Sequence, residues 1–206
     1  MDTARIIRGN CERVASSGMA FNGKSQGENS KGNINKLNGI LLCLIEEEIE
    51  LSFRSQNCLN HAGIKLIGQL VQKNETQLLN LNNFGRTSLR EIVNVLSDMD
   101  LTLEMNLDFP PWNGDGNGAE LIQILSLQRP GGGFRIDDNA AEALGINLGQ
   151  VTQKLLGVNP ADNGKNLPLL QTQYLLDRLE ARFGKDMPYL TNIIKSRRKW
   201  LEMKLR

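Results

Sequence analysis

Two short polar clusters in the middle of the sequence contain residue types that bind an anionic backbone. The first runs from Arg54 to Asn57, and the second contains Gly85, Arg86 and Ser88. Each cluster stands where a helix is expected to begin. A glycine turn directly before a helix presents backbone N–H groups and the positive end of the helix dipole, which together bind phosphate well. Arginine, asparagine and serine side chains could add contacts to a DNA backbone or groove. A capped helix with two solvated arginines is the alternative, and the residue types alone leave both interpretations open.

The sequence offers little that would indicate catalysis by histidine or cysteine, or metal binding by these residues. The sequence has one histidine, His61, which excludes histidine pairs and an H-E-x-x-H pattern. The three cysteines are scattered without a CxxC pair, so four zinc ligands cannot easily be assembled from cysteine and histidine. The run Gly131–Gly133 is interpreted as a plain turn rather than a phosphate cradle. We therefore expect no enzymatic activity, no metal and no cofactor.

Charge is distributed unevenly along the 206 residues, although the net charge is only +1. Residues 37–112 carry five lysines and arginines against ten acidic residues, a net of −5. A protein that binds nucleic acid purely by charge would carry an excess of basic residues in this range.

The cysteines and the apolar runs bear on where the protein is located. An odd number of scattered cysteines fits reduced thiols rather than disulfides. The sequence has no signal-peptide pattern and no apolar run of the roughly twenty residues that span a bilayer, so we expect a cytoplasmic protein.

The distribution of glycine, proline and helical periodicity predicts an all-α protein with two small domains. The expected parts are a flexible polar leader (1–36), a compact bundle of short helices (37–112), a linker (113–118) and a second helical domain (119–206). Within the bundle, Asn74 is placed to cap a short helix. Ser88 followed by Glu91 matches a capping box for a strong helix from about Thr87 to Met99. The helices expected in the second domain are Ala119–Leu127, Ala140–Leu144, Leu167–Phe183 and Tyr189–Leu205.

An ordered series of motifs then connects the bundle to a known family. The motifs are Ile40-Leu-Leu42, Glu50-Leu51, Arg54-Ser-x-Asn-Cys-Leu59, Ile67-Gly-x-Leu-Val-Gln72, Glu75 with Leu78-Leu79, Gly85-x-x-Ser-Leu-x-Glu-Ile92, Leu103-x-Met105 and Pro110-Pro111. With these, residues 40–112 resemble the C-terminal domain of the bacterial RNA polymerase alpha subunit. The resemblance implies a bundle with helix–hairpin–helix-like units that binds the minor groove of A/T-rich DNA and contacts transcription activators.

The resemblance also implies roles for individual residues. Arg54 occupies the position of the family's principal minor-groove arginine, and Asn57 that of its companion asparagine. Gly85 and Ser88 fall at the hairpin that contacts the DNA backbone, where Arg86 would add a phosphate contact. DNA binding is thus expected from these five residues.

Two acidic residues are candidate contacts to a protein partner, and two departures from the family pattern bear on the strength of DNA binding. Glu91, beside the hairpin, and Glu50, in the acidic approach to the first cluster, are candidate contacts to a protein partner. The family usually has a lysine where Thr87 stands, and one residue is inserted within Ile45–Ile49. Both departures predict weaker DNA binding than the family's, or a surface turned to another partner.

The second domain shows a looser resemblance. Its motifs are Leu125-Ser-Leu-Gln128, Gly133-Phe134, Leu144-Gly145-Ile146 and Arg198-Lys-Trp200-Leu201. In these, residues 119–206 are similar to the C-terminal segment of bacterial proteins with an inter-alpha-trypsin-like region and a von Willebrand A domain. This implies a small helical interaction module. The basic end of the last helix is interpreted as its solvated face.

Two functions of different classes remain open at the level of sequence. The first is a non-enzymatic DNA-binding module acting in transcription or its regulation, joined to a helical protein-interaction domain. The second is a protein adaptor that uses the same bundle without DNA. Arg54, Asn57 and the glycine hairpin favour DNA, whereas the net charge of −5 and Thr87 favour the adaptor.

Overall fold

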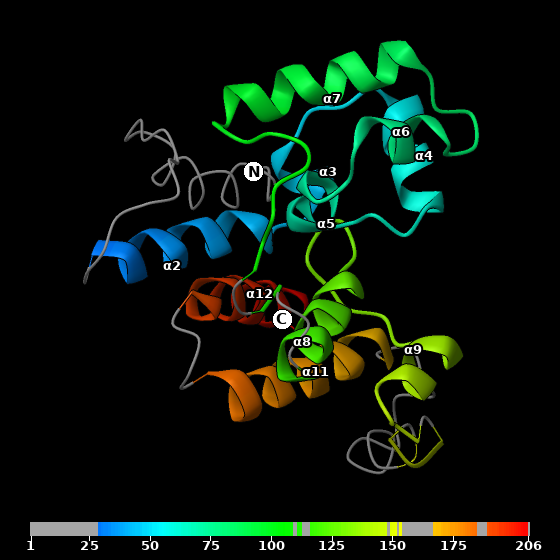
Figure 1. The fold of residues 1–206 in the computed structure, drawn as a ribbon. Coiled ribbons are helices and arrows are strands. Elements are labelled where there is room, and N and C mark those ends of the chain that lie inside the picture. Colours follow the sequence, from blue (N-terminus) through cyan, green and yellow to red (C-terminus); the bar gives the residue numbers. More distant parts are fainter. Residues whose placement is uncertain are drawn as a thin grey trace. The chain divides into compact units, whose positions relative to one another are not determined.

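The protein consists of short helices arranged in two compact units (Figure 1). The computed structural model describes residues 29–108, 111–112, 116–147, 149–151, 153, 167–184 and 189–205. Unit 1 comprises Met1–Asn113 and unit 2 comprises Gly114–Arg206. In the described ranges, β-pairing is limited to two isolated bridges, Leu44 with Leu66 and Gln128 with Phe134. The prediction of an all-α protein is confirmed.

Unit 1 is a bundle whose helices are mostly only one to three turns long. They are α2 (Asn29–Leu41), α3 (Ile45–Glu48), α4 (Phe53–His61), α5 (Ile67–Val71), α6 (Glu75–Leu79) and α7 (Arg86–Asp98). Helix α2 packs on α5, and α6 packs on α7. Fully buried leucines and isoleucines from nearly every helix form one core, including Leu41, Leu59, Ile67, Leu78 and Ile92. Helices this short are marginal in isolation, so this shared core holds them.

Helix α2 extends further toward the N-terminus than the sequence indicated. It begins at Asn29, so the end of the predicted polar leader is helical, while the leader up to residue 28 lies outside the described residues. The helix forms because tertiary contacts hold its C-terminal half against the rest of unit 1. Leu37 and Leu41 are buried, and the buried Asn38 accepts a hydrogen bond of 3.0 Å at Oδ1 from Trp112 Nε1. A residue 74 positions away thus fixes a segment with little apolar periodicity of its own.

The two predicted helix starts near Asn74 and Ser88 have different outcomes. Asn74 caps α6 as predicted: its Oδ1 accepts from Gln77 N at 2.7 Å, and Gln77 Oε1 accepts from Asn74 N at 3.1 Å. The predicted capping box of α7 is wrong, because the helix begins at Arg86 and its N-cap is Gly85. The preceding Phe84 is buried, which fixes the backbone so that Ser88 lies inside the first turn.

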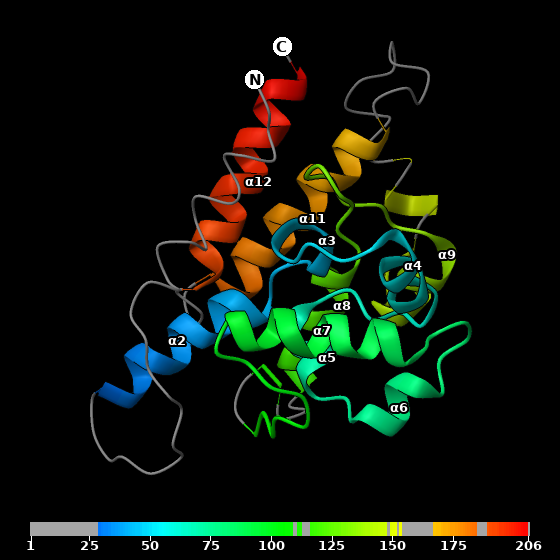
Figure 2. The same cartoon turned by 90° about the horizontal axis from the view of Figure 1, so that it is seen from above.

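Unit 2 is built around two long helices that pack side by side (Figure 2). Its described helices are α8 (Gly116–Ser126), α9 (Asp138–Ala143), α11 (Leu167–Phe183) and α12 (Leu190–Leu205). Helix α11 packs against both α12 and α8. Helix α8 starts inside the predicted linker 113–118, of which residues 113–115 lie outside the described part. The predicted helices of this domain are therefore present, with bounds that differ by a few residues.

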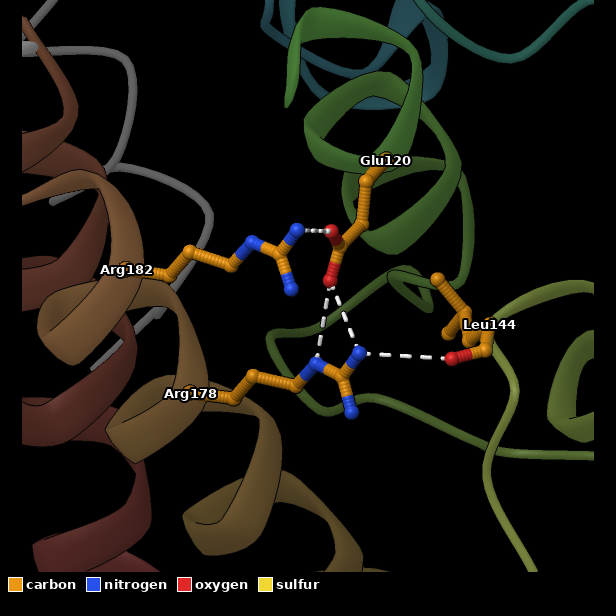
Figure 3. Close-up of polar contacts among 4 residues, drawn as sticks. All are labelled: Glu120, Leu144, Arg178 and Arg182. Carbon is orange, nitrogen blue, oxygen red and sulfur yellow. Dashed lines mark hydrogen bonds and ion pairs between the residues drawn. The ribbon is translucent and has the colours of Figure 1, made fainter. Parts of the chain in front are cut away.

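One acidic residue ties α8 to α11 (Figure 3). Glu120 Oε1 accepts hydrogen bonds from Arg178 Nε at 3.1 Å and from Arg178 Nη2 at 2.8 Å, and its Oε2 pairs with Arg182 Nη2 at 2.9 Å. Arg178 Nη2 also donates to the Leu144 carbonyl at 3.3 Å. Because Glu120 is largely buried and both of its oxygens are paired with arginines, these contacts fix the two helices more firmly than a surface ion pair would.

The triple glycine of unit 2 is a turn, as predicted, and the ring of Trp200 explains its composition. Gly131 and Gly132 have φ of 87° and 114°, which L side chains rarely adopt. A Cβ on Gly132 would lie 2.6 Å from Trp200 Cδ1, and one on Gly133 would lie 2.9 Å from Trp200 Cη2. The indole occupies the space beside these glycines, so packing rather than phosphate binding accounts for the run.

Candidate nucleic-acid interface

The structure joins the first polar cluster to the hairpin that directly precedes the second cluster in unit 1. Helix α4 starts at Phe53 because Ser52 caps it, its Oγ accepting from Ser55 N at 3.4 Å. Arg54 is exposed in the first turn of α4, and its Nε donates to the Asn83 carbonyl at 3.3 Å. Asn83 lies in the hairpin before α7 and has the left-handed φ of 61°. The first predicted cluster is therefore joined to the second through Arg54.

A second link runs between the same elements through Glu91 of α7. Its carboxylate accepts hydrogen bonds from Ser52 N, from Ser52 Oγ at 2.8 Å and from the buried hydroxyl of Ser55. Burial acts to raise the pKa of Glu91, but the hydrogen bonds from Ser55 and Ser52 outweigh it and hold the pKa below its ordinary value. The carboxylate also lies at the positive end of α4. Glu91 thus holds the start of α4 against α7, and its predicted contact with a protein partner stays a prediction.

The start of α7 has the form expected of a phosphate site. Gly85 is extended (φ −125°, ψ 176°), the helix has no cap from a side-chain group, and no acidic residue lies in its first turn. Arg86 and Thr87 are exposed. Ser88, in contrast, is only 5% exposed, so its hydroxyl is not part of the exposed surface. This end of α7 can offer backbone N–H groups and the Arg86 side chain to an anion.

The remaining predicted residues lie on or near α4. Asn57 follows Arg54 by three positions, which places both on one side of the helix. It is partly exposed, and its carbonyl lies 2.7 Å from the His61 Nδ1. Glu50 is exposed in the segment between α3 and α4 and belongs to the acidic run that starts at Glu46.

Two residues of this region were missed at the level of sequence. Arg90 is exposed on α7, four positions after Arg86, and this i, i+4 spacing alone places both arginines on one side of the helix. Phe53 is 83% exposed at the start of α4. Phe53 lies outside the side of α4 that buries Ser55, Cys58 and Leu59. This spacing along the helix was the signal from which its exposure could have been predicted.

The arginines of residues 37–112 all occur in this region, although those residues carry a net charge of −5. They are Arg54, Arg86 and Arg90, and all three are exposed. We call these arginines together with the first turn of α7 the arginine face. The Glu91 carboxylate close to it is already engaged by Ser52 and Ser55. The arginine face can therefore attract an anionic backbone although the surrounding sequence is net negative.

The described residues give no sign of a metal centre or a membrane span. No group of three or more histidine, cysteine, aspartate or glutamate side chains among them is placed to hold a metal ion. Within the same ranges, no helix is both long enough and apolar enough to cross a bilayer.

Comparison with known proteins connects this surface to transcription machinery. Residues 35–98 match the family defined by the C-terminal domain of the bacterial RNA polymerase alpha chain. The protein is 56% identical over 79 residues to the DNA-directed RNA polymerase subunit alpha of Syntrophus aciditrophicus, a match over 38% of this sequence and 23% of that protein. It is 55% identical over 84 residues to the same subunit of Pelobacter propionicus, a match over 41% of this sequence and 24% of that protein.

The match is confined to one part of each protein. The chain spans about a quarter of the length of these curated relatives. The matched family is a non-catalytic domain of the polymerase. The looser resemblance of residues 119–206 to von Willebrand A domain proteins lies outside the match and stays a prediction. Residues 35–98 are therefore similar in sequence to the C-terminal domain of the bacterial RNA polymerase alpha chain.

Proposed function

We propose that unit 1 binds DNA through the arginine face and acts in transcription or its regulation. The observation that carries the proposal is the contact of Arg54 Nε with the Asn83 carbonyl, which sets an exposed arginine beside the uncapped start of α7. A groove-reading side chain and a phosphate-binding helix end then lie on one surface. Minor-groove proteins combine these two kinds of contact.

The proposed mechanism assigns a different task to each side of the arginine face. Arg54 enters the minor groove, and its bond to Asn83 orients the guanidinium beforehand, so less side-chain freedom is lost on binding. The N–H groups at the start of α7, together with Arg86, hold a phosphate of the backbone. Asn57, on the same side of α4 as Arg54, contacts the groove edge.

We propose that unit 1 binds A/T-rich DNA and that this binding is weak. The narrow minor groove of A-tracts has an enhanced negative potential that attracts an inserted arginine. Thr87 supplies no charge at the start of α7, and residues 37–112 contain only two lysines besides the three arginines. Affinity should therefore depend strongly on the small number of arginine contacts. The relatives, being polymerase subunits, support a role at promoters and a cytoplasmic location.

The second candidate is a protein adaptor, favoured by one observation. Residues 37–112 have a net charge of −5, and exposed acids such as Glu46 and Glu50 precede α4. An acidic segment of this kind suits a basic protein partner. In this alternative the arginine face is solvated and takes no part in binding.

For unit 2 we propose a separately folded helical interaction module. Part of its basic end is committed inside the unit: Arg198 Nη2 pairs with Asp177 Oδ1 at 2.9 Å and with Glu180 Oε2, and the buried Arg197 donates from Nε to Gln128 Oε1 at 3.0 Å. These contacts favour a structural role for the basic residues over nucleic-acid binding. Limited proteolysis should cut first near residues 113–118 and leave two resistant fragments, and a first cut inside either unit would contradict separate folding.

The DNA proposal is tested by fluorescence anisotropy of the full-length protein with labelled duplexes. An A/T-rich and a G/C-rich duplex of equal length are compared at two salt concentrations. Tighter binding to the A/T-rich duplex, weakened by salt, supports the proposal. Equal, negligible binding to both duplexes at low salt would remove DNA as the partner and favour the adaptor.

A further inference from the structure

Phe53 is an exposed aromatic side chain that directly precedes Arg54, a member of the arginine face. It is the first residue of α4 and 83% of its surface is accessible to solvent. The helix buries Ser55, Cys58 and Leu59 against the core, and Phe53 is not on that side. A phenyl ring held in water gains nothing for folding, because apolar surface stabilises the fold only when it is removed from solvent.

The backbone that carries Phe53 is firmly held on both sides. Ser52 donates to Glu91 from its backbone N–H and, at 2.8 Å, from its hydroxyl. Ser55, which is fully buried, donates to the same carboxylate. The start of α4 is therefore fixed to α7, and the exposed ring projects from a rigid base.

The immediate neighbours of Phe53 favour nucleic acid as the occupant. Arg54 follows it directly, and Arg54 is bonded to the hairpin that leads into the uncapped start of α7. A cation beside an apolar ring is the combination used in the minor groove, where arginine binds the groove and an apolar side chain is wedged between two base steps. Ser52 and Arg54, on either side of the ring, are polar, so they do not extend the ring into an apolar docking surface.

We propose that Phe53 is a wedge that enters the DNA minor groove beside Arg54 and partly unstacks one base step. This inference rests on the proposed function, because it requires the arginine face to bind DNA. The preferred step is a flexible pyrimidine–purine step such as TA, which is unstacked at low cost. Phe53 thereby adds a preference for deformable A/T sequence to the electrostatic attraction of the arginines.

The test uses the full-length protein and an A/T-rich duplex that carries 2-aminopurine at a central TA step. The wild-type protein should increase the 2-aminopurine fluorescence, because unstacking relieves its quenching. Phe53→Ala should bind about tenfold more weakly and lose the increase, since the apolar contact is gone. Its salt dependence should be unchanged, because no ion pair is removed. Phe53→Leu, which keeps an apolar wedge, should recover most of both signals.

The possible results distinguish a failure of the Phe53 wedge from a failure of the proposed DNA binding by the arginine face. Binding that requires Arg54 but is unaffected in affinity and fluorescence by Phe53→Ala would overturn the wedge and leave the proposed function standing. The same result would point to a protein contact for Phe53. No binding by the wild-type protein at low salt would overturn both. Since Phe53 is exposed, its replacement should leave the melting temperature unchanged, and circular dichroism confirms that the variants are folded.

Discussion

The carboxylate of Glu91 on α7 accepts hydrogen bonds from the backbone N–H and the hydroxyl of Ser52, a residue 39 positions earlier in the sequence. This contact, together with the one from Ser55, fixes the start of α4 against α7. Arg54 and Phe53 both stand on that fixed segment. The geometry of the proposed DNA surface therefore depends on a residue that need not touch DNA.

Removing the Glu91 carboxylate should destabilise unit 1. In Glu91→Ala the buried Ser55 hydroxyl loses its acceptor on α7, and Ser52 loses two hydrogen bonds. We expect a loss of about 1–2 kcal/mol in the free energy of unfolding, the usual cost of leaving buried polar groups less well paired. Urea unfolding monitored by circular dichroism measures it. Asp98→Ala, which removes an exposed acid from the end of the same helix, is the control and should cause no loss.

The contribution of Glu91 should vanish in acid. Its folded pKa is lowered, so the unfolded protein binds a proton more readily, and the stabilisation is present above the unfolded pKa of about 4.3. It is lost as the pH falls through the lowered folded pKa. The stability difference between the wild type and Glu91→Ala should stay constant from pH 7 to about pH 5 and shrink below that. A difference that grows in acid would show that the fold does not stabilise the charged carboxylate.

The anchor between α5 and the end of unit 1 predicts a strong effect at Gly68. A Cβ there would lie 2.2 Å from Trp112 Cη2, so Gly68→Ala must displace the buried indole and should cost about 1–3 kcal/mol. Thermal unfolding and the tryptophan emission of the full-length protein report the change. Gly39→Ala in α2 has nothing within 4 Å of the new Cβ and should be neutral or slightly stabilising. Equal effects of the two substitutions would contradict the packing of Trp112 on Gly68.

Local patterns in the sequence predicted most of the elements of unit 1. Asn74 was recognised as a cap because an asparagine stands directly before the short helix, and the structure shows its partner, Gln77, three residues away. The Arg54 and Gly85 clusters were recognised because the residue types and the helix starts are local signals. The resemblance assigned both clusters to DNA binding, and the Arg54–Asn83 bond shows how their two elements are joined.

The errors arose where a distant residue decides the outcome. Glu91 lies three positions after Ser88 and therefore resembles a capping box, but its partners are Ser52 and Ser55 on another helix. Helix α2 was underestimated because its anchor, Trp112, is 74 positions away. The exposure of Phe53 and the burial of Ser88 likewise depend on which side of a helix faces the core. Residue type alone does not reveal this.

The proposed DNA binding depends above all on Arg54, and the salt dependence of that binding is the sharpest test of its role. Fluorescence anisotropy of the full-length protein on an A/T-rich duplex is measured from low to moderate salt for the wild type, Arg54→Ala and Arg135→Ala. Arg135 is an exposed arginine of unit 2, so its replacement removes the same charge elsewhere. We predict that Arg54→Ala loses at least about tenfold in affinity and lowers the slope of log K against log salt by about 1, while Arg135→Ala resembles the wild type. Equal binding by Arg54→Ala and the wild type would contradict a role for Arg54 in the groove.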